Sequence, residues 1–132
     1  DAMAAAGHPV PDALVVTAAG PTDRATGAEA AARLLDGERP TAIFCANDAL
    51  ALGLMDAAAD RGLTIPDDLA VAGFDDVDGA ALAKPPLTTV RIHKEALGET
   101  ALALLAQGVA DGTGEFPPRT VIPTELVVRA SA

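Results

Sequence analysis

The apolar residues of this 132-residue chain gather in short continuous runs, and longer alanine- and leucine-rich stretches separate these runs from one another. Strands with one face in water alternate polar and apolar residues, whereas strands of a parallel sheet are covered on both faces and read as continuous apolar runs. Runs of the second kind, separated by helices, are typical of an α/β fold. The apolar runs lie at residues 14–16, 41–46, 69–74, 87–92, 121–122 and 126–128. The sequence therefore predicts an α/β fold in which a parallel sheet is flanked by helices.

The segments between the runs carry signals that begin and end helices. Residues 1–6 read as the last turns of a helix that ends at Gly7, because glycine adopts the left-handed conformation after a helix at little cost. Asparagine is favoured at helix N-termini, so Asn47 is expected to begin a helix over residues 49–60, which Gly62 ends. Further helices are predicted over residues 24–35 and 94–106, and loops over residues 77–86 and 108–118.

The composition indicates a folded domain with an acidic surface. Half of the residues are hydrophobic, and the chain is long enough for one domain with a core. The formal net charge of −10 repels phosphate backbones, so this part of the protein is a poor candidate for direct DNA contact. The single cysteine, Cys45, excludes an intramolecular disulfide, and no apolar run is long enough to span a membrane. Because the start lacks the basic segment of a signal peptide, the sequence favours a cytoplasmic location.

Polar residues follow three of the predicted strands. In open parallel sheets, small ligands bind at the carboxyl ends of the strands. Thr22 lies in the loop after the first run, Asn47 directly follows the second, and Asp75 directly follows the third. An asparagine side chain donates and accepts hydrogen bonds, and a carboxylate accepts on two oxygens, so together they can hold the hydroxyls of a polyol. Thr22, Asn47 and Asp75 are therefore the candidate ligand-binding residues.

Structural interpretations remain open beside this one. Asn47 can simply cap the helix that follows it, and Asp75 can be a turn or cap residue. Asp76 is expected to be a cap or a surface residue, because side chains alternate along a strand and Asp75 is taken to face the ligand. Cys45 is expected to be an inert, buried thiol. No metal-ligand spacing, phosphate loop or nucleophile motif is present, so the sequence predicts neither an enzyme nor a metal or cofactor site.

Four stretches resemble the LacI/GalR family. Residues 40–53, P-T-A-I-F-C-A-N-D-A-L-A-L-G, are similar to its P-T-A-[apolar]-[apolar]-x-A-N-D-x-x-A-x-G run. Residues 62–76, G-L-T-I-P-D-D-L-A-V-A-G-F-D-D, resemble its G-L-x-[VI]-P-x-D-[apolar]-x-[apolar]-x-G-[FY]-D-[DN] run. The other two stretches are P-L-T-T-V at residues 86–90, followed by Leu97-Gly98, and P-T-E-L-V-V-R at residues 123–129, followed by Ser131. Their order and spacing agree over nearly the whole chain.

This resemblance implies a transcriptional regulator with a two-lobed core similar to periplasmic sugar-binding proteins. A small effector, a sugar or related polyol, binds between the lobes and shifts the equilibrium between forms that hold the DNA operator well or poorly. The family's N-terminal helix-turn-helix is absent from this chain, so DNA would be contacted only through that missing domain. By resemblance, Asn47 and Asp75 fall on the family's effector-contacting residues. Thr22 falls where many members place an aromatic that stacks on the sugar, and Ile92 where some place a polar Gln.

The resemblance also implies how the chain is divided. Residues 8–90 are expected to form the C-terminal lobe, residues 91–120 a crossing segment whose helix reaches the absent N-terminal lobe, and residues 121–132 the closing strands. Leu52 and Leu82 are candidates for the family's homodimer surface, with core burial as the alternative for Leu52. Without its usual cover, the crossing helix would expose leucines and drive self-association. The alternative function is that of a solute-binding protein of a sugar transport system.

Overall fold

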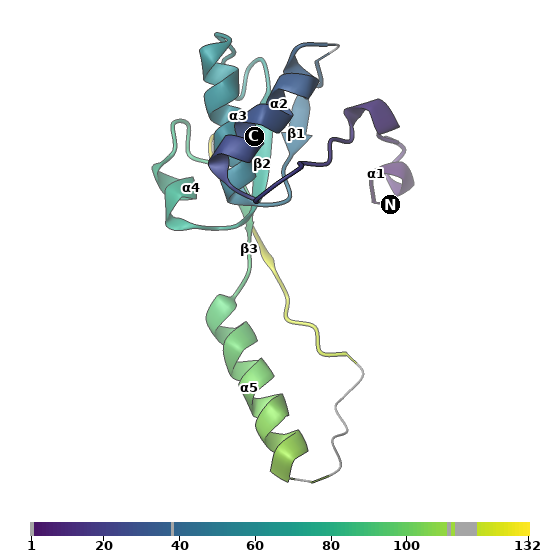
Figure 1. The fold of residues 1–132 in the computed structure, drawn as a ribbon, viewed down its shortest axis with the longest axis vertical. Coiled ribbons are helices and arrows are strands. Elements are labelled where there is room, and N and C mark those ends of the chain that lie inside the picture. Colours follow the sequence, from purple (N-terminus) through teal and green to yellow (C-terminus); the bar gives the residue numbers. More distant parts are fainter. Residues whose placement is uncertain (1, 38, 111, 113–118) are drawn as a thin grey trace.

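A four-stranded sheet forms the centre of the structure, a computed structural model that describes residues 2–37, 39–110, 112 and 119–132. In order across the sheet, the strands are β1 (Ala42–Phe44), β2 (Ala70–Asp75), β3 (Thr88–Arg91) and β4 (Glu125–Val127). β1, β2 and β3 run parallel, and β4 is antiparallel to β3 (Figure 1). The prediction of a parallel sheet is confirmed for three strands, and the last apolar run adds an antiparallel edge.

Two of the apolar runs do not form strands. At residues 14–16, the chain enters from a short 3₁₀ helix, η1 (Asp12–Leu14), and the N–H groups of Leu14 and Val15 donate to carbonyls three residues earlier. These turn hydrogen bonds use the amide groups that a strand would need for pairing. Residues 121–122 are not in a strand, and the proline that follows them cannot donate to a ladder. The predictions of strands at these two places are wrong.

The helices follow the predicted segments, except that the last one runs on to Ala110, past its predicted end at residue 106 and into a segment expected to be a loop. They are α1 (Ala2–Ala5), α2 (Arg24–Leu35), α3 (Asp48–Asp60), α4 (Asp78–Leu82) and α5 (Lys94–Ala110). α2 has its predicted bounds because the Asp23 side chain accepts from the N–H of Thr26 and caps it. α3 ends as predicted before Gly62, which takes a left-handed φ of 73°. α4 was not predicted, since it lies in a segment expected to be a loop, where it is anchored by the buried Ala80.

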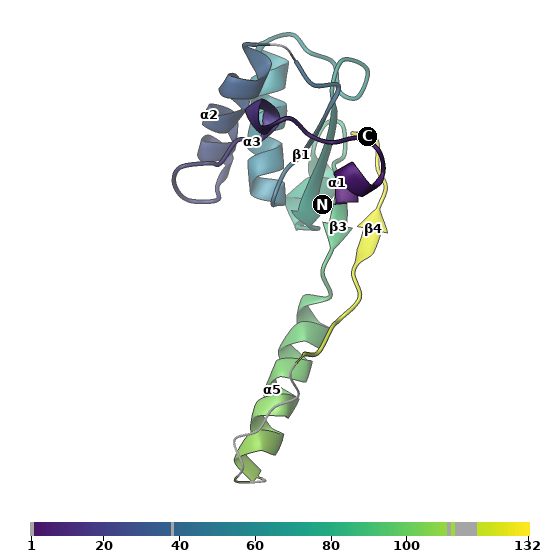
Figure 2. The ribbon, with the colours of Figure 1, turned by 90° about the vertical axis from the view of Figure 1, so that its right-hand side faces the viewer.

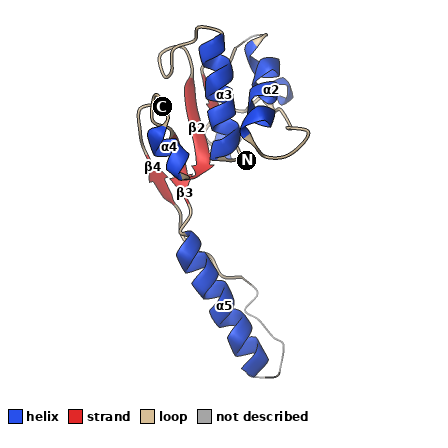
Figure 3. Ribbon diagram, turned by 60° about the vertical axis from the view of Figure 1, so that its left-hand side comes forward, coloured by secondary structure: helices blue, strands red, loops and turns tan. Residues whose placement is uncertain are grey.

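α3 packs on one face of the sheet, and α2 packs on α3 (Figures 2 and 3). Two glycines bring these helices into backbone contact. A Cβ atom built on Gly53 would lie 1.9 Å from the carbonyl oxygen of Arg24, and one on Gly27 would lie 2.3 Å from that of Leu50. Core residues cluster between α2, α3 and the sheet; they are Ala31, Leu35, Cys45, Ala51, Leu54, Met55, Ala57, Ala58, Leu69, Val71, Ala80 and Leu87.

Apolar side chains remain exposed in two places. On the sheet face away from α3, Phe44 and Leu126 are 64% and 63% exposed. α5 extends away from the sheet at the end of β3 (Figure 1), and Leu97, Leu102 and Leu105 along it are exposed. The helix predicted after residue 91 is therefore present, and these three leucines are uncovered by the described residues, while its crossing to a second lobe stays a prediction.

Candidate functional site

Asn47 and Thr22 come together at the carboxyl end of β1. The Oδ1 atom of Asn47 accepts a hydrogen bond from the N–H of Leu50 at 2.9 Å and caps α3. Its Nδ2 atom donates to the carbonyl oxygen of Thr22 at 3.3 Å. The capping interpretation of Asn47 is therefore confirmed. One N–H and one lone pair of the amide are left for another partner. The Thr22 side chain is exposed and lies in the loop before α2.

Asp75 ends β2, the strand that pairs with β1. Within the part of the chain that the structure describes, its half-buried carboxylate makes no hydrogen bond or ion pair. Its φ is 114°, and that of Asp76 is 51°. Non-glycine residues in this region cost roughly 1–3 kcal/mol each and persist only where the surroundings hold them. The candidate ligand aspartate thus lies at a strained turn with its acceptor oxygens free.

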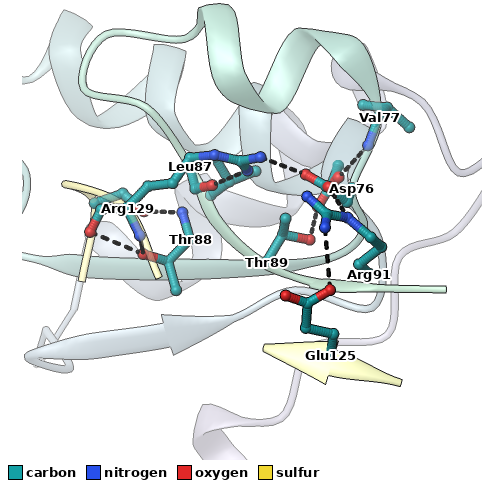
Figure 4. Close-up of polar contacts among 10 residues, drawn as sticks. Asp76, Val77, Leu87, Thr88, Thr89, Arg91, Glu125 and Arg129 are labelled. Carbon is teal, nitrogen blue, oxygen red and sulfur yellow. Dashed lines mark hydrogen bonds and ion pairs between the residues drawn. The ribbon is translucent and has the colours of Figure 1, made fainter. Parts of the chain in front are cut away.

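Asp76 joins three segments of the chain through ion pairs, which the sequence did not predict (Figure 4). Its Oδ1 atom lies 2.6 Å from an Nη atom of Arg129, and its Oδ2 atom 2.6 Å from Nε of Arg91. Arg91 also pairs with Glu125 at 3.0 Å. The prediction of a cap or surface residue is wrong, because the side chain of Asp76 is only 9% exposed. Alternation along a strand does not apply here, since the left-handed φ of Asp75 turns the backbone out of the strand.

The environment of Asp76 favours the ionised carboxylate. Burial by itself would raise the pKa of Asp76, but hydrogen bonds and charges of Arg129 and Arg91 outweigh it and lower the pKa below its ordinary value. The two arginines meet different surroundings. Arg129 is largely buried and also donates to the carbonyl oxygen of Leu87 at 2.7 Å, whereas Arg91 is more exposed.

Asp48, which follows Asn47, is buried and holds the turn after β2 through hydrogen bonds. It is fully buried; its Oδ1 atom accepts from the Thr89 hydroxyl at 2.5 Å, and its Oδ2 atom from the N–H of Val77 at 2.9 Å. A Cβ atom on Gly73 would lie 2.3 Å from Oδ1, so only glycine leaves room for this carboxylate. Asp48 was not singled out from the sequence. Its position two residues after an apolar run was the available signal for burial.

The C-terminal end of the chain is tied to the middle of the sheet by Ser131. The Ser131 hydroxyl is buried, donates to the carbonyl oxygen of Val71 at 2.6 Å and accepts from the N–H of Thr88 at 2.8 Å. The carbonyl oxygen of Ser131 accepts from the N–H of Val71 at 2.7 Å. These contacts place Arg129, two residues earlier, against Asp76.

A shallow groove lies between α3 and α4, away from Asn47 and Asp75. Its volume is about 370 Å³, and both Leu52 and Leu82 line it. Leu82 is 79% exposed, and Leu52 is half-buried against the core. Arg24 and Asp56 form an ion pair at its rim, 2.5 Å apart. The two leucines expected at a dimer surface thus share one groove.

Cys45 is buried at the end of β1, as the sequence predicts. Burial raises the pKa of the Cys45 thiol to about 11, with a smaller contribution from the negative charge of Asp48. Among the described residues, no group of three or more His, Cys, Asp or Glu side chains is arranged to hold a metal ion. No helix in the described ranges is both long and apolar enough to cross a bilayer.

Comparison with known proteins places this arrangement in a family. The sequence model of the periplasmic binding protein-like domain matches residues 1–132. The HTH-type transcriptional regulator DegA of Bacillus subtilis is 38% identical over 130 residues, which cover 98% of this chain and 38% of DegA. The HTH-type transcriptional repressor PurR of Mannheimia succiniciproducens is 43% identical over 94 residues, which cover 71% of this chain and 28% of the repressor.

Solved structures of transcriptional regulators are also similar to this chain. A putative LacI-family regulator from Sanguibacter keddieii is 44% identical with a TM-score of 0.88, over 98% of this chain and 49% of its own. The transcriptional regulator CelR in complex with cellobiose is 33% identical with a TM-score of 0.89, over 99% of this chain and 39% of CelR. The chain thus spans about a third of the length of the two curated relatives. It belongs to the LacI/GalR family of transcriptional regulators and corresponds to the C-terminal part of their periplasmic-binding-protein-like core.

Proposed function

We propose that this chain is the effector-binding and dimerisation part of a LacI-type transcriptional regulator, in which a small molecule controls DNA binding by a helix-turn-helix elsewhere in the full-length protein. The observation that carries the proposal is the pair formed by Asn47 and Asp75. They lie at the carboxyl ends of the neighbouring parallel strands β1 and β2, and both keep hydrogen-bonding capacity that the described residues do not use. Ligands bind at this edge in open α/β sheets.

The chemistry of the pair favours a neutral polyol. Asp75 supplies two acceptor oxygens, and Asn47 supplies one N–H and one lone pair, which suits hydroxyl groups that both donate and accept. A carboxylate repels an anion, so the same site is poorly suited to a free phosphate. Relatives of known structure include the CelR–cellobiose complex and a LacI-family regulator from Enterococcus faecium with bound ribose, which supports a sugar as effector. Thr22 lies at the rim and offers no aromatic face for stacking.

The groove lined by Leu52 and Leu82 is the proposed homodimer surface. An exposed leucine over an apolar floor gains free energy when a second copy covers it, at about 25 cal/mol per Å² of apolar surface buried. The Arg24–Asp56 ion pair at the rim matches the polar border of such interfaces. DNA is contacted by another part of the protein, because the net charge of −10 disfavours this part.

Regulation, and not catalysis or transport, is the function we infer. The named relatives are transcriptional regulators. An effector that binds one form of the regulator more tightly shifts the equilibrium toward that form, and DNA affinity changes by the same linkage. A solute-binding protein of a transport system shares the fold, but the relatives do not favour it.

Isothermal titration of the full-length protein with cellobiose and D-ribose tests the site. Asp75→Ala removes charge-assisted hydrogen bonds worth about 1.5–3 kcal/mol, so the affinity for the bound sugar should fall roughly 10- to 150-fold. Asp60→Ala is the matched control, since Asp60 is an exposed aspartate at the far end of α3. Unchanged affinity in Asp75→Ala would show that the site has been assigned to the wrong residue.

A further inference from the structure

The turn at the end of β2 holds two consecutive non-glycine residues in the left-handed region. Asp75 has a φ of 114° and Asp76 a φ of 51°. Residues with a Cβ atom avoid this region because the Cβ approaches the following carbonyl group, and aspartate, which enters it more often than most, does so as a single residue. Neighbouring contacts must therefore hold the turn, and the residues that make them decide where the Asp75 carboxylate lies.

Three contacts hold the turn, and none involves the Asp75 side chain. The Asp76 carboxylate is held on one oxygen by Arg129 and on the other by Arg91, each at 2.6 Å. The next residue, Val77, donates its N–H to the buried carboxylate of Asp48 at 2.9 Å. The β2–β3 ladder holds the backbone up to Asp75 and these contacts hold it from Asp76 onward, while the carboxylate of Asp75 keeps free acceptor oxygens.

We propose that Asp76 is a positioning residue for effector binding: its ion pairs with Arg91 and Arg129 hold the turn that presents the Asp75 carboxylate to the ligand. The proposal deepens the function proposed above and rests on it. Asp76 does not contact the effector and acts through Asp75.

The two arginines contribute unequally. The Arg129 side chain is 17% exposed, and its other Nη atom donates to the carbonyl oxygen of Leu87. Its backbone N–H also donates to the hydroxyl of Thr88 at 2.9 Å. Arg91 is 40% exposed and divides its guanidinium between Asp76 and Glu125. A partly exposed ion pair is screened by water, so Arg129 is the principal anchor.

The network also reaches the segments that join the sheet to α5. Arg91 ends β3, which leads into α5, and Arg129 follows β4, which returns from it. A movement of either strand relative to the sheet would shift a partner of Asp76. The position of Asp75 is thereby linked to the strands before and after α5, and effector affinity depends on how these two strands are arranged.

The test combines titration with structure determination on the full-length protein. Cellobiose and D-ribose are titrated into the wild type and into five variants: Asp75→Ala, Asp76→Asn, Arg129→Gln, Arg129→Lys and Arg91→Gln. Crystal structures of the wild type and of Asp76→Asn report the φ of Asp75.

Asp76→Asn keeps the shape of the side chain and removes its charge. It should weaken sugar binding at least about tenfold and relax the Asp75 φ. Arg129→Gln should do the same, Arg129→Lys should restore most of the affinity, and Arg91→Gln should cost less.

Two controls separate positioning from stability. Asp36→Asn breaks an aspartate–arginine pair elsewhere on the surface, with Arg61 at 3.0 Å, and should leave affinity unchanged. Leu35→Ala lowers the melting temperature by opening a cavity in the core beneath α2, away from the arginines, and should also leave affinity unchanged. If Leu35→Ala weakens binding as much as Asp76→Asn, the loss follows stability alone and the proposal is wrong.

The outcomes distinguish the two proposals. Loss of binding in Asp75→Ala together with wild-type affinity in Asp76→Asn would overturn the positioning role and leave the ligand site standing. If wild type binds neither sugar, or Asp75→Ala binds as wild type does, the proposed sugar site fails. The crystal structures then decide: an unchanged Asp75 turn in Asp76→Asn overturns the positioning role, and a relaxed turn supports it. Should Asp76→Asn fail to fold, Arg91→Gln takes its place, because it removes only the more exposed partner.

Discussion

Asp48 offers the sharpest test of how the structure is held together, because alanine and asparagine at this position should behave very differently. Asp48→Ala leaves the part-buried N–H of Val77 and the fully buried hydroxyl of Thr89 without the partner they have in the wild type. Hydrogen bonds to a charged group contribute about 1.5–3 kcal/mol each, so the loss should be about 3–6 kcal/mol in the free energy of unfolding. That is a large part of the roughly 5–15 kcal/mol that stabilises a typical domain.

Asp48→Asn should cost only about 1–2 kcal/mol, since it loses the charge assistance and the favourable position of a negative charge in the first turn of α3. Its amide oxygen can accept from Val77, and its amide N–H can donate to the Thr89 hydroxyl, which rotates to accept. Both partners stay satisfied.

Urea unfolding followed by circular dichroism, at low micromolar concentration, measures both values. Asp60→Ala is the control: it removes the same side chain from the exposed last residue of α3, where a negative charge opposes the helix dipole, so stability should not fall. Equal losses in Asp48→Ala and Asp48→Asn, or a loss below about 1 kcal/mol in Asp48→Ala, would refute the account of this hydrogen-bond pair.

Two further predictions concern other parts of the chain. With a thiol pKa of about 11, Cys45 should react with iodoacetamide at pH 8 far more slowly in the native chain than in urea; equal rates would contradict its burial. The isolated chain should self-associate through the uncovered leucines of α5, and replacing Leu102 and Leu105 by lysine should reduce its mass by light scattering; a wild-type monomer would contradict this.

Local signals in the sequence predicted the fold well wherever they agreed with long-range contacts. The caps at Asp23 and Asn47 set the starts of α2 and α3, because each side chain accepts a hydrogen bond from an N–H in the first turn. The strand predicted at residues 14–16 does not form, since so short an apolar run becomes a strand only where another strand pairs with it. A turn that begins upstream had already used its amide groups.

The sequence predicted that Asn47 and Asp75 lie at the carboxyl ends of neighbouring strands, and the structure has them there, Asn47 just after β1 and Asp75 at the end of β2. That they bind a ligand stays a prediction, and the contacts that support Asp75 were not predicted. The network around Asp76 was missed because its partners, Arg91 and Arg129, lie 15 and 53 residues further along the chain. Only the register of β2, β3 and β4 brings such distant side chains together, and one sequence read locally contains no signal for it.

The glycine contact between α2 and α3 has a consequence for association. Where backbone touches backbone at Gly27 and Gly53, no side chain can change rotamer to let the helices slide. Leu52 and Asp56, which line the groove, flank Gly53 on α3, and Arg24 lies where α2 meets it. The wall of the groove that α2 and α3 form is therefore held in place before the proposed partner binds. A preorganised surface loses less conformational entropy on binding, so more of the apolar surface that it buries appears as affinity.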